Sequence, residues 1–297
     1  MLLYSIPEQL SMISEAPNHR NYPAPCSMEV ISLHRYAVKG LSSDCMKSVY
    51  VDKGFPSDRK YALIKKTKRS LFDEENPKWL HKENFLCAFT RNELMASFDS
   101  NFVEDTSELT VWKRLENYDQ TRQQVPLLSA NLESIEGRKE VSEFFSEACG
   151  EPFQLITASD HQFGNTSKGV KARGDTRTCH IVNAATVRSL SAAIGVNLNP
   201  LRFRPNIVVD GLEPWSEFKY IGKNLVNQGK CKDLRMYICA RTVRCDGISV
   251  DPLNRSEILN IPNLLSKHFP EHGPYLGVYA LVDTPGIIDI GDTLTII

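Results

Sequence analysis

Arginine and cysteine stand side by side at Arg244-Cys245, after a β-rich apolar run and before a turn-forming Asp251-Pro252. A neighbouring guanidinium favours the thiolate form of a cysteine over the thiol. A thiolate acts either as a nucleophile or as a ligand for a soft metal ion. The alternative is a buried structural thiol, which is the commonest role of a single cysteine and is modestly favoured by the residues alone.

A second polar cluster, Arg204-Pro205-Asn206, stands just before an apolar run. Because Pro205 restricts the residue before it, we expect Arg204 to be extended and to project with Asn206 from the start of a strand. A guanidinium suits a phosphate or an electron-rich heterocycle, and an amide offers both a donor and an acceptor. An ion pair of Arg204 with Asp210 or Glu213 explains the residues equally well.

Two further cations lie at the ends of expected strands. Lys39 follows one strand and precedes Gly40, where the backbone can turn tightly. Arg59 precedes a strand that we expect at residues 61–65. Each is most often a solvated surface charge when considered alone. If their side chains converged with Arg204, they would form an anion pocket.

The bulk composition is that of an ordinary enzyme. The chain has 297 residues, of which 41% are hydrophobic and 24% charged, and its formal net charge is −1. That charge gives no general attraction to nucleic acid, so an anion site must be built locally. The eight cysteines include no C-x-x-C pair, which indicates reduced thiols.

No apolar run approaches the roughly 20 residues of a membrane span. The N-terminus has neither a signal-peptide core nor transit-peptide character. We therefore expect a cytosolic protein by default. There is also no G-x-G-x-x-G, P-loop, H-E-x-x-H or G-x-S-x-G motif, which argues against dehydrogenases, P-loop NTPases, zincins and α/β-hydrolases.

The spacing of short apolar runs predicts a mainly β fold with a few helices (α+β), arranged as a barrel or sandwich. Helices are predicted at 140–149, at 184–194 with Asn183 as its N-cap, and at 255–268 with a break at Pro262. We expect a flexible leader at 1–27, a smaller β module at 28–124 and a larger β-rich domain at 125–297. The boundary is placed in the polar stretch 116–124.

With these residues in view, the chain resembles a MOSC-domain protein, and within that superfamily the mitochondrial amidoxime-reducing component group. The two most specific pieces are the F-R-P-N-I segment and the spacing of Arg-Cys to Val-Asp-Pro. The matching pieces, in chain order, are Tyr36-Ala-Val-Lys39, Asp58-Arg59, Phe203-Arg-Pro-Asn-Ile207, Arg244-Cys245 with Val250-Asp-Pro252, and Pro285-Gly-Ile-Ile-Asp-Ile-Gly-Asp292.

The resemblance implies an N-terminal MOSC-type β-barrel module at 28–124, followed by a MOSC β-barrel domain at 125–297. It also implies a molybdenum cofactor (Mo-molybdopterin), with Cys245 as the molybdenum ligand and catalytic thiolate. The residues that it assigns to binding of the pterin and phosphate are Lys39, Arg59, Asn183, Arg204, Asn206 and Arg244.

The chain departs from the family's pattern in two places. Gly40 stands where relatives often have serine, and Asp246-Gly247 follows Cys245 where relatives have apolar residues. These departures bear on substrate range more than on cofactor binding. The group's membrane-anchoring segment is also missing from this sequence. The group's location leaves mitochondrial association open beside the cytosolic default.

The expected activity is reduction of N-oxygenated, for example N-hydroxylated, small molecules by removal of oxygen. Neither a ferredoxin nor a flavin module is fused to the chain, so the electrons would come from a separate b-type cytochrome, flavoprotein or ferredoxin. One alternative is a carrier of the molybdenum cofactor or of sulfur, without turnover of its own. A scaffold that binds no cofactor is the third hypothesis.

Overall fold

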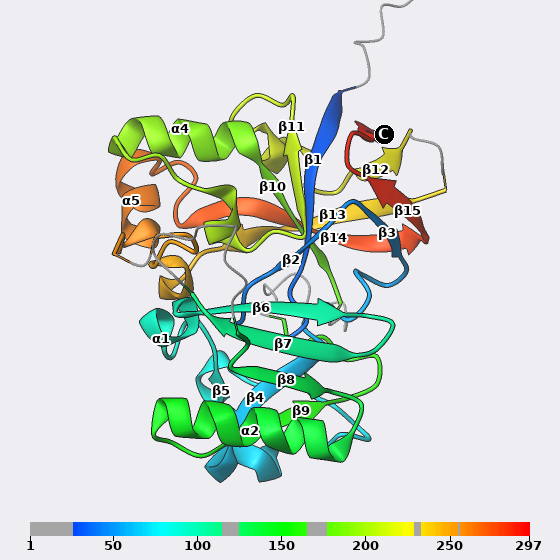
Figure 1. Ribbon diagram of the computed structural model, residues 1–297. Helices are drawn as coiled ribbons and strands as arrows, with labels where there is room; N and C mark the ends of the chain where they lie inside the picture. Colours follow the sequence, from blue (N-terminus) through cyan, green and yellow to red (C-terminus); the bar gives the residue numbers. More distant parts are fainter. Residues whose placement is uncertain (1–25, 115–124, 165–176, 229–232, 255) are drawn as a thin grey trace, which may run out of the picture.

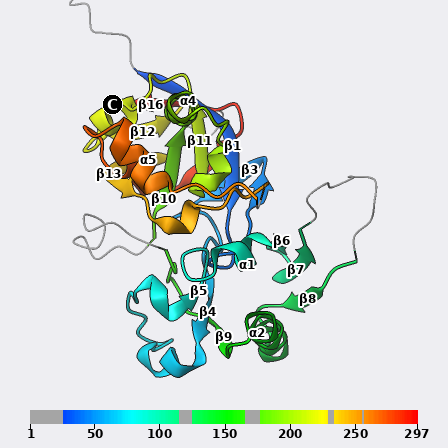
Figure 2. The same ribbon diagram turned by 90° about the vertical axis from the view of Figure 1, so that its left-hand side faces the viewer.

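The computed structural model describes residues 26–114, 125–164, 177–228, 233–254 and 256–297. Two parts are stacked on one another in Figure 1, with a barrel above and a smaller module below. The view turned by 90° in Figure 2 shows the same two parts and the segments that connect them. The expected leader lies outside the described residues except for 26 and 27.

Seven strands close into a barrel, in the order β1-β11-β10-β14-β13-β12-β16 and back to β1. The ring closes because β1 pairs antiparallel with both β11 and β16. The only parallel pair in the ring is β10 with β11. The strands are β1 (Ser27–Arg35), β10 (Cys179–Asn183), β11 (Ile207–Asp210), β12 (Asn224–Asn227), β13 (Arg235–Val243), β14 (Tyr275–Thr284) and β16 (Thr293–Ile296).

Alternating burial of side chains along the strands gives the barrel an apolar interior. Met28 and Val30 of β1 point inward between exposed neighbours, as a half-buried strand requires. The barrel core joins these residues to Ile181, Val209 and Leu294 from three other strands. Complete closure leaves no unpaired edge within the ring. The predicted β class and barrel architecture are therefore confirmed.

Short elements decorate the barrel. Strand β2 (Asp44–Met46) pairs with the end of β1, and β3 (Ser48–Val51) forms a ribbon with β15 (Gly286–Asp289). Helix α4 (Ala184–Ile194) packs on β10 and β11 and against α5 (Ile261–His268).

The smaller module contains two three-stranded sheets. One has the order β5-β4-β9 and the other β6-β7-β8, and α2 packs on β8 and β9. Phe98, Phe144 and Phe145 meet edge to face between the second sheet and α2. The elements are β4 (Tyr61–Lys65), β5 (Phe85–Leu86), α1 (Asn92–Ala96), β6 (Phe98–Val103), β7 (Glu108–Lys113), β8 (Leu128–Asn131), α2 (Ile135–Cys149) and β9 (Phe153–Thr157).

The division between the two parts does not fall at residue 124. Strand β8, helix α2 and strand β9 all follow that residue, yet they pair and pack with the smaller module. Strand β1 precedes it, yet belongs to the barrel. The predicted polar boundary at 116–124 lies within residues 115–124, outside the described residues. Sequence order could not reveal these pairings because each part draws strands from both sides of the stretch.

The helix predictions are confirmed in place and differ at their ends. Helix α4 has the predicted limits, and the Asn183 side chain accepts a hydrogen bond from the Ala185 amide at 3.0 Å. Helix α2 starts at Ile135, five residues before the predicted start, with Ser134 as its N-cap. Helix α5 starts next to Pro262 rather than breaking there, because proline fits the first turn of a helix.

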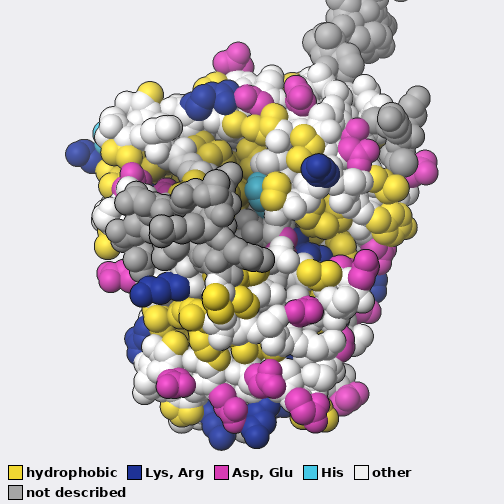
Figure 3. Space-filling model, in the orientation of Figure 1, with side chains coloured by type: hydrophobic (Ala, Val, Ile, Leu, Met, Phe, Trp, Pro, Cys, Tyr) yellow, Lys and Arg dark blue, Asp and Glu magenta, His cyan; other side chains and the backbone are white. Residues whose placement is uncertain are grey.

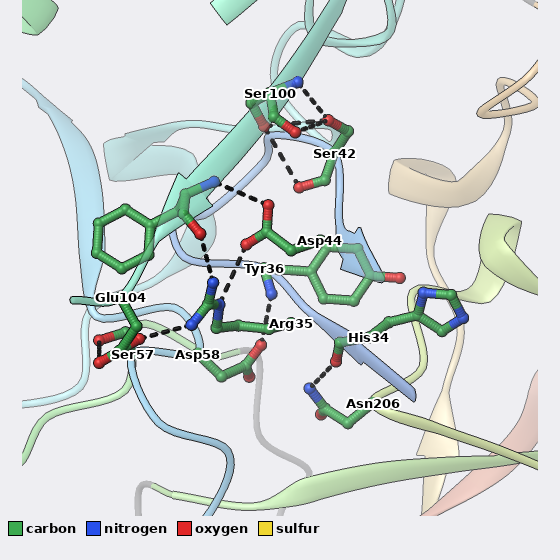
Figure 4. Close-up of polar contacts among 11 residues, drawn as sticks. His34, Arg35, Tyr36, Ser42, Asp44, Ser57, Asp58, Ser100, Glu104 and Asn206 are labelled. Carbon is green, nitrogen blue, oxygen red and sulfur yellow. Dashed lines mark hydrogen bonds and ion pairs between the residues drawn. The ribbon is translucent and has the colours of Figure 1, made fainter. Parts of the chain in front are cut away.

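Arg35, at the end of β1, ties the barrel to the smaller module. Its buried guanidinium donates to Asp44 at 3.1 Å, to Glu104 at 2.6 Å and to the Phe102 carbonyl at 2.5 Å (Figure 4). Val38, three residues after Arg35, forms a β-bridge with Tyr61 at the start of β4. The segment that joins the two parts is thus held by buried charge as well as by backbone hydrogen bonds.

Gly277 is the most restrictive glycine of the barrel wall. Its φ is +79°, and a Cβ atom there would lie 2.7 Å from both His180 Nε2 and the Ile181 carbonyl oxygen. We predict that Gly277→Ala lowers the free energy of unfolding by about 3 kcal/mol. The control is Gly222→Ala, where φ is +89° but no atom lies within 4 Å, and we expect a loss of about 1 kcal/mol. Equal losses in urea unfolding would contradict the steric argument.

Candidate active site

An open cavity of about 840 Å³ lies between the barrel and the smaller module. Its wall carries five basic side chains and no carboxylate among the described residues. On the outer surface, by contrast, Figure 3 shows charges of both signs scattered over the part of that face not covered by grey. The basic residues of the wall are Lys39, Arg59, Lys82, Arg204 and Arg244.

Arg204 and Arg59 both have left-handed backbones, with φ of 54° and 52°. The predicted extended conformation of Arg204 is wrong. A following proline disfavours the right-handed helical region, and Arg204 ends a short 3-10 helix, η3 (Pro200–Phe203), in the left-handed one instead. Such a conformation costs about 1 kcal/mol or more for a non-glycine residue.

The two guanidinium groups contact the ring of Tyr36, at 4.7 Å for Arg59 and 4.2 Å for Arg204. Arg59 also donates to the Arg204 carbonyl at 3.1 Å. No carboxylate among the described residues pairs with Arg204. Arg204 therefore forms no ion pair with Asp210 or Glu213, and Asp210 is paired with Arg188 instead, at 2.7 and 2.8 Å. Burial lowers the pKa of Arg204 to about 10.

Asp58 orders this group of cations from behind the cavity wall. Its buried carboxylate pairs with Arg59 and accepts hydrogen bonds from the Tyr36 amide at 2.8 Å and from Gln162 at 2.7 Å. Figure 4 shows the contact with the Tyr36 amide. Burial acts to lower the pKa of Arg59, but Asp58 and Tyr36 outweigh it and the pKa is raised. Arg59 therefore remains a fixed cation.

Arg244 is buried and is held by the barrel. One nitrogen donates to the Phe203 carbonyl at 2.9 Å, and another lies 3.5 Å from His180 Nε2. His180 Nδ1 lies 3.2 Å from the Arg204 carbonyl, which can only accept, so Nδ1 carries the proton. Burial and then Arg244 lower the pKa of His180 well below its ordinary value, so the ring is neutral. Burial also lowers the pKa of Arg244.

Cys245 lines the cavity, partly exposed, at the start of a short 3-10 helix, η5 (Asp246–Ile248). The two residues after it dock that helix on the smaller module. Asn92 donates to the Asp246 carbonyl at 2.8 Å, and a Cβ atom at Gly247 would lie 3.3 Å from the Phe89 nitrogen. Close packing between η5 and the smaller module thus explains the glycine at 247, whereas Asp246 takes part only through its backbone carbonyl.

Arg202 joins two of the sequence pieces that carry the resemblance. Its buried guanidinium donates to the Ser249 carbonyl at 2.6 Å and pairs with Asp251 at 3.1 Å and Glu257 at 2.5 Å. Arg202, which directly precedes the F-R-P-N-I segment, therefore anchors the loop that follows Cys245. Removing one partner of such a buried pair costs about 3–5 kcal/mol.

Lys39 is another of the basic side chains on the cavity wall. Its ammonium donates to the Phe163 carbonyl at 2.8 Å and lies 5.6 Å from the centre of the Phe85 ring. Burial lowers the pKa of Lys39 to about 8. The structure thus brings Lys39, Arg59, Arg204, Arg244 and Cys245 to one cavity.

Asn206 and Asn183, which were both predicted to bind the cofactor, lie in different places. Asn206 lines the cavity, but its amide accepts from the His180 amide at 3.0 Å and donates to the His34 carbonyl at 3.1 Å. It therefore holds three barrel strands together. Asn183 does not line the cavity. Besides capping α4, it donates to the Glu213 carbonyl and to Glu217 at 3.0 and 3.1 Å.

Sequence reasoning missed several lining residues. Lys82, Cys87 and Phe89 come from the smaller module, in a stretch with no informative motif. His180 and Tyr279 face each other from paired strands, with ring centres 5.4 Å apart. Only the position of His180 at the start of an apolar run could have marked it.

Two buried polar atoms of the wall have no hydrogen-bond partner among the described residues. They are Thr242 Oγ1 and Arg244 Nε. Buried polar groups are normally satisfied, so both point to a bound partner. No group of three or more histidine, cysteine or carboxylate side chains in the described part of the chain could hold a metal ion. A metal at Cys245 would have to bring most of its ligands with it.

Residues 161–295 match the family model of the MOSC domain. This part of the chain is a MOSC domain. MOSC domains are of the type found at the C-terminus of molybdenum cofactor sulfurase and are associated with binding of that cofactor. The match covers five strands of the barrel and most of β16, and β1 closes the ring from outside it.

Two solved structures resemble the chain at low identity. YuaD from Bacillus subtilis has 10% identity and a TM-score of 0.38, and the match covers 91% of this chain and 95% of that one. YiiM from Geobacillus stearothermophilus has 14% identity and a TM-score of 0.31, over 40% of this chain and 53% of that one. No curated protein matches the sequence. No helix in the described ranges is long and apolar enough to cross a membrane.

The cavity should bind a small dianion with a pH dependence set by Lys39. Sulfate keeps its charge between pH 7 and 9.5, so only the protein titrates. We predict that sulfate affinity, measured by calorimetry, falls as the pH rises through about 8 and Lys39 loses its proton. In Lys39→Arg the decline should be much smaller, because arginine stays charged.

An equal decline in Lys39→Arg would contradict the assignment.

The stability of the ligand-free protein should change with pH in the direction opposite to the sulfate affinity. Between about pH 8 and the ordinary lysine pKa the unfolded chain binds more protons at this site, so Lys39 makes the ligand-free protein more stable as the pH rises.

Proposed function

We propose that this protein is a molybdenum-cofactor-dependent reductase of N-oxygenated small molecules, similar to the amidoxime-reducing component group. The observation that carries the proposal is the cavity itself, where five basic groups and a partly exposed cysteine face one another with no carboxylate on the described wall. Cations taken from water without a partner are unfavourable, so the cavity is suited to a multiply charged anion.

The residues fit a molybdopterin with a terminal phosphate. The unpartnered Thr242 Oγ1 and Arg244 Nε offer polar contacts for a heterocycle or phosphate. Cys245 offers a single soft ligand, which suits a metal that arrives already bound to a dithiolene. When bound, the cofactor would supply two-electron oxygen-atom-transfer chemistry, with electrons and protons from a separate donor protein.

The chain's own residues would act by binding, orientation and charge. Arg59 and Arg204 would hold the anionic end through charge-assisted hydrogen bonds, and Lys39 would do the same below about pH 8. Arg244 would stabilise the thiolate of Cys245. Arg202 and the docked helix η5 would fix the position of that thiolate against the cavity.

In the net reaction an N–OH group gains two electrons and two protons, the N–O bond breaks, and water leaves. The substrate is neutral at the reacting group, so the cationic wall does not repel it. The electron donor would be a b-type cytochrome, a flavoprotein or a ferredoxin.

The test compares three cysteine variants made in a host that produces the cofactor. We expect wild-type protein to contain molybdenum and to reduce benzamidoxime with a chemical electron donor. Cys245→Ala should lose both the metal and at least about 100-fold in activity, because losing even a group that only orients a metal ligand costs about 10- to 100-fold. Cys45→Ala is the matched control, because Cys45 is an exposed thiol on β2.

Two results would overturn the proposal. Molybdenum retained in Cys245→Ala but lost in Cys87→Ala would place the ligand on the other thiol of the wall. Fully loaded wild-type protein that leaves benzamidoxime unreduced, with a persulfide on Cys245 in its mass spectrum, would favour a carrier of cofactor or sulfur.

A further inference from the structure

Lys82 and Phe89 form a cation-and-apolar surface in the cavity, and neither residue is among those assigned above to hold the cofactor or to position the Cys245 thiolate. The Lys82 ammonium lies 3.3 Å from the centre of the Phe89 ring, and both residues line the cavity. An ammonium over a ring face is held in place by the ring's quadrupole. Among the described residues, no carboxylate is paired with Lys82. Its charge is therefore both positioned and available.

The pair lies on the Cys245 side of the cavity. Phe89 packs against Gly247, two residues beyond Cys245, with its nitrogen, Cα and Cβ atoms 3.3–3.5 Å from where a Cβ atom of Gly247 would be. Val243 and Ile248, on either side of Cys245 in sequence, also line this cavity. An apolar surface and one cation thus lie beside the thiol.

Arg59 and Arg204 form a separate contact group around Tyr36. Both contact the Tyr36 ring, and Arg59 is bonded to the Arg204 carbonyl. With the anionic end of the cofactor held by these two residues and its metal at Cys245, Lys82 and Phe89 would be left to contact the substrate.

We propose that Lys82 and Phe89 form a substrate subsite that favours an N-hydroxylated compound with an apolar, planar body and an anionic group at its far end. The body packs on Phe89, Val243 and Ile248, and a carboxylate pairs with Lys82. This inference rests on the proposed function, because it names the substrate class of the same site.

The experiment measures binding and turnover separately. Benzamidoxime and 4-carboxybenzamidoxime differ by one carboxylate. Dissociation constants are measured by calorimetry on the cofactor-loaded protein without an electron donor, and KM is measured with one. We expect wild-type protein to bind the carboxylated compound roughly fivefold more tightly, the value of a partly exposed ion pair. The ratio of the two KM values should show the same preference.

Lys82→Gln should remove this preference in both measurements. Lys78→Gln is the matched control: it makes the same change of charge on an exposed lysine of the smaller module that does not line the cavity, and it should keep the preference. Phe89→Ala should weaken binding of both compounds by a similar factor, and its folding is checked by thermal unfolding.

The subsite is overturned if the two compounds have equal dissociation constants in the wild type. It is also overturned if Lys82→Gln leaves the ratio of these constants unchanged. The subsite is also overturned if folded Phe89→Ala protein binds both compounds as tightly as the wild type. Failure of the proposed function is distinguishable, because neither compound would then be reduced by loaded wild-type protein. The calorimetric preference would still decide whether Lys82 binds the carboxylate.

Discussion

Positive charge without a carboxylate in the same cavity is the constraint on which the rest of the site depends. Like charges that are buried together repel, and each has lost part of its hydration. The structure limits this cost in three ways. Asp58 neutralises Arg59 from behind the wall, the Tyr36 ring contacts two guanidinium groups, and backbone carbonyls accept from Arg244 and Lys39. The remaining charge is compensated only when an anion binds.

The backbone around Arg204 also helps to hold several cations in one cavity. Its carbonyl accepts from Arg59 and lies within reach of His180, while its own guanidinium remains in the cavity. A left-handed conformation at both Arg59 and Arg204 makes these directions possible. Such conformations occur where the surrounding structure over-determines them, often at functional sites. Here the surrounding structure is the junction of barrel and module, which Arg35 ties together, and the loop after Cys245, which Arg202 anchors.

The sequence predicted the parts of this site that are local. The limits of α4, its cap and the β class follow from periodicity and from short-range capping, and they are confirmed. The convergence of Lys39, Arg59, Arg204 and Arg244 could only be expected from a family resemblance. These residues are up to 205 positions apart (244 − 39), and which strands close the barrel is not a local property.

The differences between sequence and structure have the same origin. Asn183 was expected at the cofactor, but its side chain is used by the helix that it caps and by buried Glu217. Arg204 was expected to be extended, but the turn that ends η3 decides its backbone. Lys82 and Phe89 were missed because the contact of Phe89 with Gly247 joins two parts of the chain that no motif connects.

The pterin content of Arg204→Met protein tests the central claim most directly. Methionine keeps much of the length and removes the charge, and Arg235→Met is the control because Arg235 is exposed on β13, outside the cavity. Both variants and the wild type are purified from a cofactor-producing host, and the pterin is measured as its fluorescent oxidation product. The account predicts wild-type pterin content in Arg235→Met and at least about tenfold less in Arg204→Met, the effect of losing one charge-assisted contact. Equal pterin content in all three proteins would contradict it.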